Sequence, residues 1–411
     1  MFPASSLLSL LLIAVSCNAA AVPVARELKT LAFARSLNVT GGPVNIAEAD
    51  RARFRVLKDQ AFGQASSADK RSTSILATNT AVTYTANVGV GTPPTEYTLL
   101  IDRAAGSSNT WVGANKTFVA TSSSVNTGHT VKVSYGSGSF SGTEYTDTVT
   151  LGTGLTVTKA SIGVATTATG FDGVDGILGL GPNLLTLGTV GGTLVVPTIA
   201  DELKSQGAIS TESIGIYYAP TTSETVANGE LTFGGVDTTK YTGSITYTPI
   251  TSVSPASVYW GIDQELTYGL TTTLLSAGSG IVDTGTTLIL IASDAYSTYV
   301  SATGGVLDSA TGLLEITAAQ YASLKSLYFK IGGTTFNLLP NAQIWPRALN
   351  TYIGGNEGSI YLVVGNSGLP SGHGLDFING YAFLERFYSV FDTTNKRVGF
   401  ATTAFTTSTS N

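Results

Sequence analysis

The chain contains very little cysteine, histidine or charge. Its 411 residues include one cysteine, two histidines and 12% charged residues, beside 43% hydrophobic residues and 47 glycines. The single cysteine, Cys17, excludes an internal disulfide and a thiolate metal site. With only His129 and His373, a His-rich metal site or a Ser-His-Asp triad has little material. We therefore expect no metal, and we interpret both histidines as ordinary loop residues.

Long apolar runs are absent after the N-terminus. The segment from Ser5 to Cys17 is apolar and rich in leucine, but it is too short to span a bilayer. It ends in the small residues Cys17-Asn18-Ala19, which is typical of a secretory signal peptide. The sequence predicts a signal peptide over 1–19 and a secreted, extracellular protein without a membrane anchor. The alternative is a retained, buried helix.

Charge is distributed unevenly along the chain. Residues 1–71, which we call the leader, hold nine Lys/Arg and five Asp/Glu, a net charge of +4. Residues 72–411, which we call the body, hold 12 Lys/Arg and 22 Asp/Glu, a net charge of −10. The pair Lys70-Arg71 lies at this change and resembles a dibasic processing site. We expect residues 20–71 to be a propeptide docked by charge, which added salt would loosen. The alternative is a disordered basic linker.

The order of expected elements indicates an all-β protein with a helical leader. Asn45 followed by Glu48 resembles a capping box before a helix over 46–58. From Ser72 onward, short alternating segments and frequent turn residues predict strands, as in Val131–Tyr135 and Gly243–Thr248. The few helices are expected over 197–206, 293–302, 318–328 and 382–388.

One short pattern occurs twice. The later copy is Gly280-Ile281-Val282-Asp283-Thr284-Gly285-Thr286-Thr287, and the earlier copy places Asp102 after Leu99-Leu100-Ile101. The two aspartates are 181 residues apart, so each half of the mature chain holds one copy. We expect two facing β lobes, an N-terminal lobe over 72–250 and a C-terminal lobe over 251–411.

Two such loops suit a specific chemistry. Glycine lets another backbone segment come close to the loop, and neighbouring hydroxyl side chains hydrogen-bond the carboxylate or its loop. Two carboxylates brought within a few ångströms cannot both ionise, so they share a proton at acidic pH. One then acts as a general base toward water and the other as a general acid toward a carbonyl, which is peptide hydrolysis without a cofactor.

Further motifs resemble those of pepsin-family aspartic proteases over nearly all of 72–411. The region Gly89–Pro94 resembles the family's entry strand, and Val133–Gly142 resembles its flap. Phe171–Gly181 and Phe377–Leu384 resemble the strands that cross behind the two catalytic loops, although Asn379 and Tyr381 replace the commoner Leu and Asp. The resemblance implies a bilobal pepsin-like fold with a few short helices, and a zymogen of an acid protease.

The resemblance also implies roles for individual residues. The catalytic pair would be Asp102 and Asp283. The flap and substrate-binding residues would be Tyr135, Gly136, Ser137, Gly285 and Thr286, and the supporting residues Ser107, Trp111 and Thr284. In this scheme Ser107 and Thr286 bond the outer carboxylate oxygens, Thr284 reaches toward the opposite loop, and the Tyr135 hydroxyl lies near Trp111. Taken alone, Tyr135 is an ordinary strand aromatic and Trp111 a core residue.

The first loop departs from the family pattern. Where the family has one threonine between the aspartate and the glycine, this chain has Arg103-Ala104-Ala105 before Gly106. The insertion displaces Gly106 and places a guanidinium near Asp102, which favours the ionised carboxylate. Three interpretations remain: a misplaced exon junction in the gene prediction, an inactive homologue that retains a peptide-binding cleft, or a working enzyme whose loop bulges outward.

The sequence therefore predicts a secreted aspartic endopeptidase that acts at acid pH through Asp102 and Asp283. The alternative is a catalytically impaired, peptide-binding homologue. The implied partners are protein and peptide substrates, pepstatin-type inhibitors and the chain's own propeptide, with no cofactor, nucleic acid or membrane, and the protein would be a monomer. Sequons at Asn115 and Asn38 are candidate N-glycosylation sites.

Overall fold

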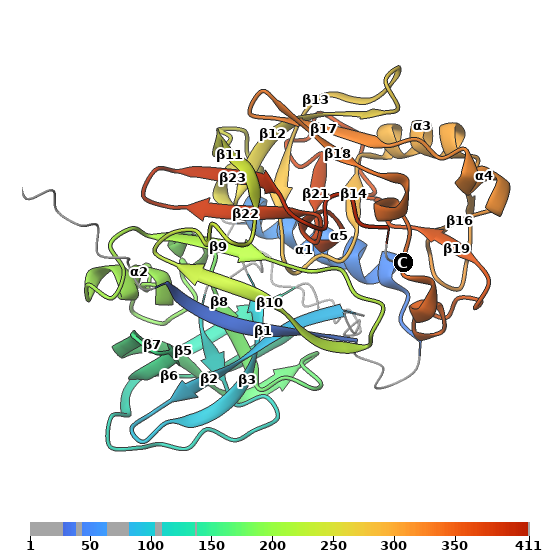
Figure 1. Ribbon diagram of the computed structural model, residues 1–411. Coiled ribbons are helices and arrows are strands. Elements are labelled where there is room, and N and C mark those ends of the chain that lie inside the picture. The colour runs from blue at the N-terminus through green and yellow to red at the C-terminus, as the bar shows by residue number, and fades with distance from the viewer. Residues whose placement is uncertain (1–27, 38–42, 64–81, 103–108, 136–137, 410–411) are drawn as a thin grey trace, which may run out of the picture.

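The structure is a computed structural model that describes residues 28–37, 43–63, 82–102, 109–135 and 138–409. The molecule is bilobal and mostly β, as the sequence predicts. In Figure 1 the green and cyan lobe lies below the yellow and red lobe, and the blue leader helix runs alongside the latter. The expected signal peptide over 1–19 and the Lys70-Arg71 site lie outside the described residues.

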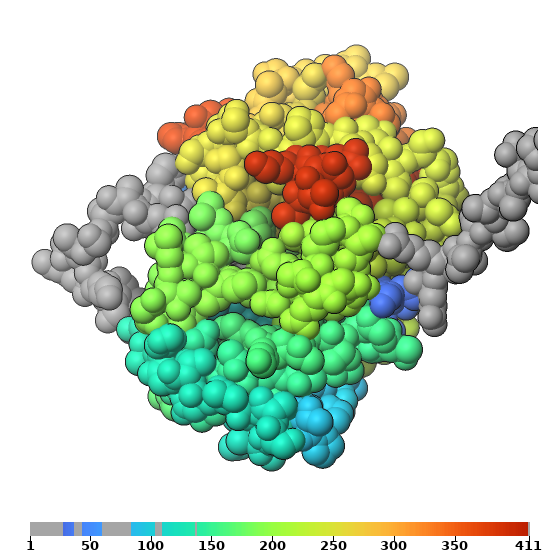
Figure 2. All heavy atoms as spheres, turned by 90° about the vertical axis from the view of Figure 1, so that its left-hand side faces the viewer, coloured from blue at the N-terminus to red at the C-terminus, as the bar shows by residue number. Residues whose placement is uncertain are grey.

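The larger sheet has 13 strands and draws on the leader and on both halves of the chain. In spatial order its strands are β11 (Thr242–Pro249), β23 (Arg397–Thr402), β22 (Phe387–Asp392), β9 (Ser213–Tyr217), β10 (Thr225–Phe233), β1 (Lys29–Leu37), β2 (Val82–Val90), β3 (Thr95–Asp102), β8 (Gly176–Gly179), β4 (Trp111–Val112), β7 (Leu155–Thr169), β6 (Ser139–Gly152) and β5 (Val125–Ser134). The C-terminal strands β22 and β23 thus lie beside β9 and β11, and their dark red atoms are seen between green and yellow segments in Figure 2.

Two smaller sheets complete the second lobe. The seven-stranded sheet runs β18 (Thr334–Leu338), β17 (Leu327–Ile331), β12 (Gly261–Tyr268), β13 (Thr272–Val282), β21 (Phe377–Asn379), β14 (Ile289–Ile291) and β20 (Val364–Asn366). The three-stranded sheet runs β15 (Val306–Leu307), β16 (Leu314–Ile316) and β19 (Ile360–Leu362).

The repeat seen in the sequence is also a repeat of topology. In the first lobe β3 pairs with β8 in parallel, β8 with β4 antiparallel, and β4 with β7 in parallel. In the second lobe β13, β21, β14 and β20 repeat this order of directions. Each Asp-containing segment therefore ends a strand that is paired with the crossing strand behind it.

Helices are few and mostly short. They are α1 (Ile46–Gly63), α2 (Ile199–Ser205), α3 (Ser293–Thr303), α4 (Ala318–Ala322) and α5 (Tyr381–Leu384), with 3₁₀ turns η1 (Asn183–Thr186), η2 (Ala256–Val258), η3 (Pro340–Gln343) and η4 (Arg347–Ile353). The helices expected over 46–58, 197–206 and 293–302 are confirmed, the first extending further than predicted. None of the helices in the described part of the chain is long and apolar enough to cross a membrane.

Two helix predictions were wrong at their C-terminal ends. The helix expected over 318–328 ends at Ala322, because the following Leu327–Ile331 alternates buried and more exposed residues and pairs as strand β17. The helix expected over 382–388 ends at Leu384, and β22 begins at Phe387. In both places strand pairing overrides a weak helical preference.

Strand β1 of the leader was not predicted. It lies between β10 and β2 and pairs antiparallel with both. Leu31, Phe33 and Arg35 are buried, whereas the residues between them are more exposed. This alternation is typical of a strand with one buried face. The charged residue Arg35 lies on that buried face.

Candidate active site

The two repeated aspartates occupy equivalent positions in the two lobes. Asp102 is the last residue of β3, and its carbonyl accepts a hydrogen bond from Leu180 N at 2.9 Å. Asp283 directly follows β13, and its N–H donates to the carbonyl of Asn379 at 3.2 Å. Both side chains are buried. Each carboxylate is thus held where an apolar strand ends against its crossing strand.

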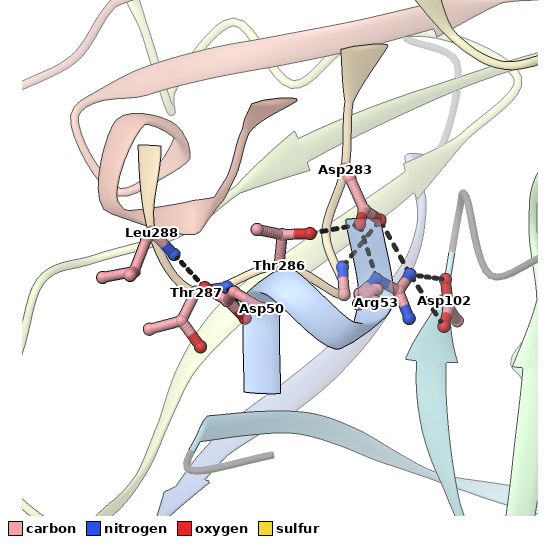
Figure 3. A network of polar contacts seen from close by, with 8 residues as sticks. Asp50, Arg53, Asp102, Asp283, Thr286, Thr287 and Leu288 are labelled. Atoms are coloured by element: carbon pink, nitrogen blue, oxygen red, sulfur yellow. Dashed lines mark hydrogen bonds and ion pairs between the residues drawn. The ribbon is translucent and has the colours of Figure 1, made fainter. Parts of the chain in front are cut away.

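The two carboxylates meet at one side chain of the leader. Nη2 of Arg53, on α1, donates to Asp102 Oδ1 at 3.0 Å and Oδ2 at 3.2 Å, and to Asp283 Oδ1 at 3.0 Å. Arg53 Nε donates to Asp283 Oδ2 at 2.7 Å. Figure 3 shows the guanidinium between the two carboxylates. Since both carboxylates lie within 3.2 Å of a single nitrogen, the lobes do bring the two Asp-containing loops together.

The guanidinium fits because residue 285 is glycine. A Cβ on Gly285 would lie 2.1 Å from Arg53 Nη2 and 2.3 Å from Cζ. No side chain larger than hydrogen fits there while Arg53 stays in place. The sequence predicted that glycine would allow a close approach to the loop, and in this structure the approaching group belongs to the leader.

The surroundings of Asp283 favour its ionised form. Its carboxylate accepts hydrogen bonds from Thr286 Oγ1 at 2.6 Å and from Gly285 N at 2.9 Å. Burial alone would raise its pKa, but the positive charge of Arg53 and these hydrogen bonds outweigh burial and hold the pKa of Asp283 below its ordinary value. The hydrogen bond expected between Thr286 and Asp283 is present.

A second leader carboxylate contacts the same loop. Asp50 lies one helical turn before Arg53 and accepts hydrogen bonds from Thr287 N at 3.2 Å and Leu288 N at 2.7 Å. Burial raises the pKa of Asp50 to about 7, although the two N–H groups and Arg53 act in the opposite direction. Asp50 and Arg53 together fix α1 over the second Asp-containing loop.

Sequence reasoning missed both leader residues, although a pattern was available. Of the buried positions in α1, Ile46, Ala49, Asp50, Arg53, Phe54 and Leu57 follow the spacing of one helix face, and Ala47 and Ala52 are buried as well. Two charged residues on an otherwise apolar face indicate partners elsewhere in the fold, since buried charges require pairing. The same face is anchored again where Tyr259 donates to the carbonyl of Leu57 at 2.7 Å.

The capping prediction for this helix was half right. Glu48 N donates to Asn45 Oδ1 at 2.9 Å, as in a capping box. The Glu48 carboxylate pairs instead with Arg51 at 3.1 Å and Arg55 at 2.8 Å. These two arginines are therefore neutralised within the leader and not by the acidic body.

The expected flap is the hairpin of β5 and β6. Tyr135 N donates to the carbonyl of Gly138 at 2.7 Å, which closes the hairpin. Tyr135 and Trp111 both pack edge-on against Phe171, at ring-centroid distances of 5.6 and 4.7 Å. The Trp111 Nε1 is buried without a hydrogen-bond partner among the described residues. The two aromatic side chains are therefore linked through Phe171, and no hydrogen bond joins them.

Several expected site residues remain untested. Ser107, Gly136, Ser137 and the whole Arg103-Ala104-Ala105 replacement lie outside the described residues. Thr284 is described, and its Oγ1 is buried without a hydrogen-bond partner in the described part of the chain. The expected contact of Thr284 with the opposite loop stays a prediction.

The candidate glycosylation site has its amide engaged. Asn115 Nδ2 donates to the carbonyls of Phe171 at 2.9 Å and Val174 at 2.5 Å. A side-chain amide has two hydrogens to donate, and both are used here. Asn38 lies outside the described residues.

No group of three or more His, Cys, Asp or Glu side chains in the described ranges is arranged to hold a metal ion. His129 lies away from the aspartate pair, with Nδ1 3.0 Å from Glu144 Oε2. The chemically reactive groups of the site are the two buried carboxylates of Asp102 and Asp283, where the two lobes meet. A leader cation neutralises them in this state.

Comparison with known proteins agrees with this geometry. A family model described as eukaryotic aspartyl protease matches residues 83–403, and so begins after β1 and α1. Polyporopepsin of Irpex lacteus is 64% identical over 340 residues, 82% of this chain and 99% of that protein. Gastricsin of Cavia porcellus is 34% identical over 349 residues, covering 78% of this chain and 80% of that protein. A crystal structure of an aspartic proteinase from Irpex lacteus matches 80% of this chain and 96% of its own, with 64% identity and a TM-score of 0.77.

Proposed function

Since this chain belongs to the pepsin family of aspartic endopeptidases, we propose that it is a secreted acid protease, made as a zymogen, with Asp102 and Asp283 as its catalytic pair. One observation carries the proposal: both carboxylates lie within 3.2 Å of the same nitrogen of Arg53. Carboxylates this close are able to hold one water molecule between them once the guanidinium has left.

Hydrolysis then follows from the like charges of the pair. Without Arg53, two adjacent buried carboxylates cannot both ionise, so one proton is shared between Asp102 and Asp283. The ionised member takes a proton from water as it attacks the substrate carbonyl, and the protonated member donates to the carbonyl oxygen, which gives a tetrahedral intermediate. The carboxyl that gained the water proton then passes it to the peptide nitrogen as the C–N bond breaks. The other carboxylate takes a hydroxyl proton from the intermediate, which releases the acid and amine products and restores the pair. The Thr286 hydroxyl and the Gly285 N–H, which already donate to Asp283, keep that carboxylate in position.

Residues 20–71 act in this scheme as an inhibitory propeptide. Arg53 occupies the place of the catalytic water, and its charge keeps both carboxylates ionised, which prevents the sharing of a proton. Protonation of the carboxylates in acid removes the attraction for Arg53 and releases α1. Cleavage at Lys70-Arg71 would make the release permanent.

The substrates are proteins and peptides bound in extended form beneath the β5–β6 flap. We expect inhibition by pepstatin, a monomeric enzyme, and secretion directed by residues 1–19. The alternative, a peptide-binding homologue impaired by Arg103-Ala104-Ala105, receives no support from the comparisons. It remains a defined outcome of the following test.

The test compares two purified chains, the sequence as given and a variant with a single threonine in place of residues 103–105. Each is incubated at acid pH with a denatured protein, with and without pepstatin, beside Asp283→Asn as the inactive control. Pepstatin-sensitive cleavage by the given sequence supports the proposal. Cleavage only by the threonine variant assigns the impaired, peptide-binding role to the chain as given. Sequencing of the transcript across residues 100–109 then decides which of the two chains is made.

A further inference from the structure

The leader has a second buried cation, far from the catalytic pair in sequence and in a different element. Arg35 lies on β1 and is 1% exposed. It lies on the buried face of β1 together with Leu31 and Phe33, so its guanidinium has no access to solvent. A buried guanidinium requires acceptors supplied by the body of the protein.

The acceptors come from segments that are distant in sequence. Arg35 Nη1 donates to the carbonyl of Thr221 at 3.1 Å, and Nε lies 3.8 Å from Glu385 Oε1. The Trp345 ring lies beside the guanidinium, 5.9 Å from Cζ to the ring centroid. Tyr84 on β2 donates its hydroxyl to the same Glu385 oxygen at 2.9 Å. A carboxylate, a carbonyl and an indole face thus surround a planar cation.

The segment that precedes the body cannot replace this cation. Residues 72–81 contain no lysine or arginine. If β1 leaves with the propeptide, Glu385 stays buried with the Tyr84 hydroxyl and the neighbouring Arg386, but without Arg35. A cavity of only about 30 Å³ remains beside Arg35, Thr221, Trp345 and Glu385, so little free space is left around the guanidinium.

We propose that Glu385, the Thr221 carbonyl and Trp345 form a guanidinium-recognising site, separate from the catalytic pair, that selects an extended peptide strand carrying arginine. In the zymogen this strand is β1. The site therefore retains the leader by a second, independent contact. This inference rests on the proposed role of residues 20–71 as a propeptide.

Charged and titratable groups from several elements surround Glu385. They are Arg35 on β1, Tyr84 on β2, Tyr381 on α5 and Arg386, which follows Glu385. Burial is the largest cause and raises the pKa of Glu385 above its ordinary value, although Arg35, the Tyr84 hydrogen bond and Arg386 act in the opposite direction. The charge of Arg35 therefore offsets part of the cost of burying this carboxylate.

The test uses the full chain at neutral pH and reads hydrogen exchange at the β1 amides, which needs no catalytic activity. Arg35→Ala should raise exchange across β1 by about tenfold or more. N-ethylguanidinium should partly restore protection in Arg35→Ala, and ethylammonium at the same ionic strength should not. Lys29→Ala is the matched control, because Lys29 lies on the same strand and its Nζ donates to the Gly154 carbonyl at the surface. Restoration by both cations, or by neither, overturns the proposal.

Two further variants keep the test decisive even if Arg35→Ala misfolds. Arg35→Lys keeps the charge but not the planar donor set, and it should exchange like Arg35→Ala; exchange like the parent chain contradicts guanidinium selection. In Arg35→Ala/Glu385→Gln, the response to N-ethylguanidinium should disappear. Protection of α1 is recorded in the same spectra. Rapid exchange of α1 in the unaltered chain would refute the proposed propeptide, whereas changes confined to β1 concern only the Arg35 site.

Discussion

The guanidinium of Arg53 lies directly over the Cα of Gly285, in the space that any side chain at position 285 would occupy. A Cβ there would be 2.1 Å from Arg53 Nη2. The residue that leaves room for substrate in the proposed enzyme therefore also leaves room for the inhibitor.

Gly285→Ala should expel Arg53 from the site. The overlap exceeds what side-chain adjustment can relieve, because Arg53 is held on both sides by carboxylates. We expect trypsin to cleave after Lys58 at neutral pH at least about tenfold faster than in the parent chain. Gly333→Ala is a suitable control, since no atom lies within 4 Å of a Cβ there, although its positive φ of 82° adds local strain. Unchanged cleavage in Gly285→Ala would contradict the observed position of Arg53.

Arg53→Gln should abolish most of the latency of the zymogen. Removing one partner of a buried ion pair costs roughly 3–5 kcal/mol, because two carboxylates are left buried without their cation. Docking of α1 should weaken by about 100-fold or more, measured as accessibility of the site to a fluorescent pepstatin analogue. Arg51→Gln is the control, since the Arg51 side chain pairs with Glu48 of the leader and is 33% exposed. Equal effects of the two variants would argue against a special role for Arg53.

Salt should have little effect on leader docking. The sequence predicted a charge-docked leader that salt would loosen, but the cations that pair with carboxylates of the body are buried, with the side chains of Arg53 4% and Arg35 2% exposed. Arg51 and Arg55 pair within the leader. Buried pairs are screened far less than surface pairs. We expect the rate of activation to change less than about threefold between low and high salt. A steep salt dependence would restore the original expectation.

Docking of helix α1 on the body should depend on pH in two opposite ways, one for Asp283 and one for Asp50. Arg53 lowers the pKa of Asp283 in the docked state, so this contribution is present above the ordinary carboxyl pKa and is lost as the pH falls through the lower value. Burial raises the pKa of Asp50 to about 7, so its contribution weakens as the pH rises toward 7. Asp50→Asn should remove the second dependence and leave the acid release. Hydrogen exchange at the α1 amides from about pH 2 to pH 8, corrected for the intrinsic exchange rate at each pH, measures both limbs. Identical profiles of Asp50→Asn and the parent chain would refute the role of Asp50.

Asn115 should carry no glycan in the folded protein. Its amide donates to the carbonyls of Phe171 and Val174, and a glycan would remove one of these donors. Asn115→Ala should reduce stability by roughly 1–3 kcal/mol, because two partly buried carbonyls lose their donor. Intact-mass analysis of the secreted protein before and after glycosidase treatment tests the first statement. A mass loss that maps to Asn115 would show that the two hydrogen bonds are not both made in the glycosylated protein, and would contradict this prediction.

Much of the architecture was readable from the sequence. The alternation of short segments predicted an all-β protein, and the duplicated Asp-Gly loops predicted two lobes that bring Asp102 and Asp283 together. The helix over 46–58 was predicted from its cap and composition. These inferences succeeded because each depends on local pattern, or on a repeat whose two copies must fold in the same way.

The amino-acid pattern was sufficient to predict the fold class, the pair of carboxylates and the basic character of the leader. Which of the leader's cations contact the body depends on the folded arrangement: Arg53 and Arg35 reach buried carboxylates of the body, whereas Arg51 and Arg55 pair with Glu48. The net charge of the leader does not show which arginines contact the body, because the carboxylates that Arg53 and Arg35 meet are far away in sequence and come near only on folding. It is burial beside a carboxylate, and not net charge, that gives a cation its effect on docking and on pKa.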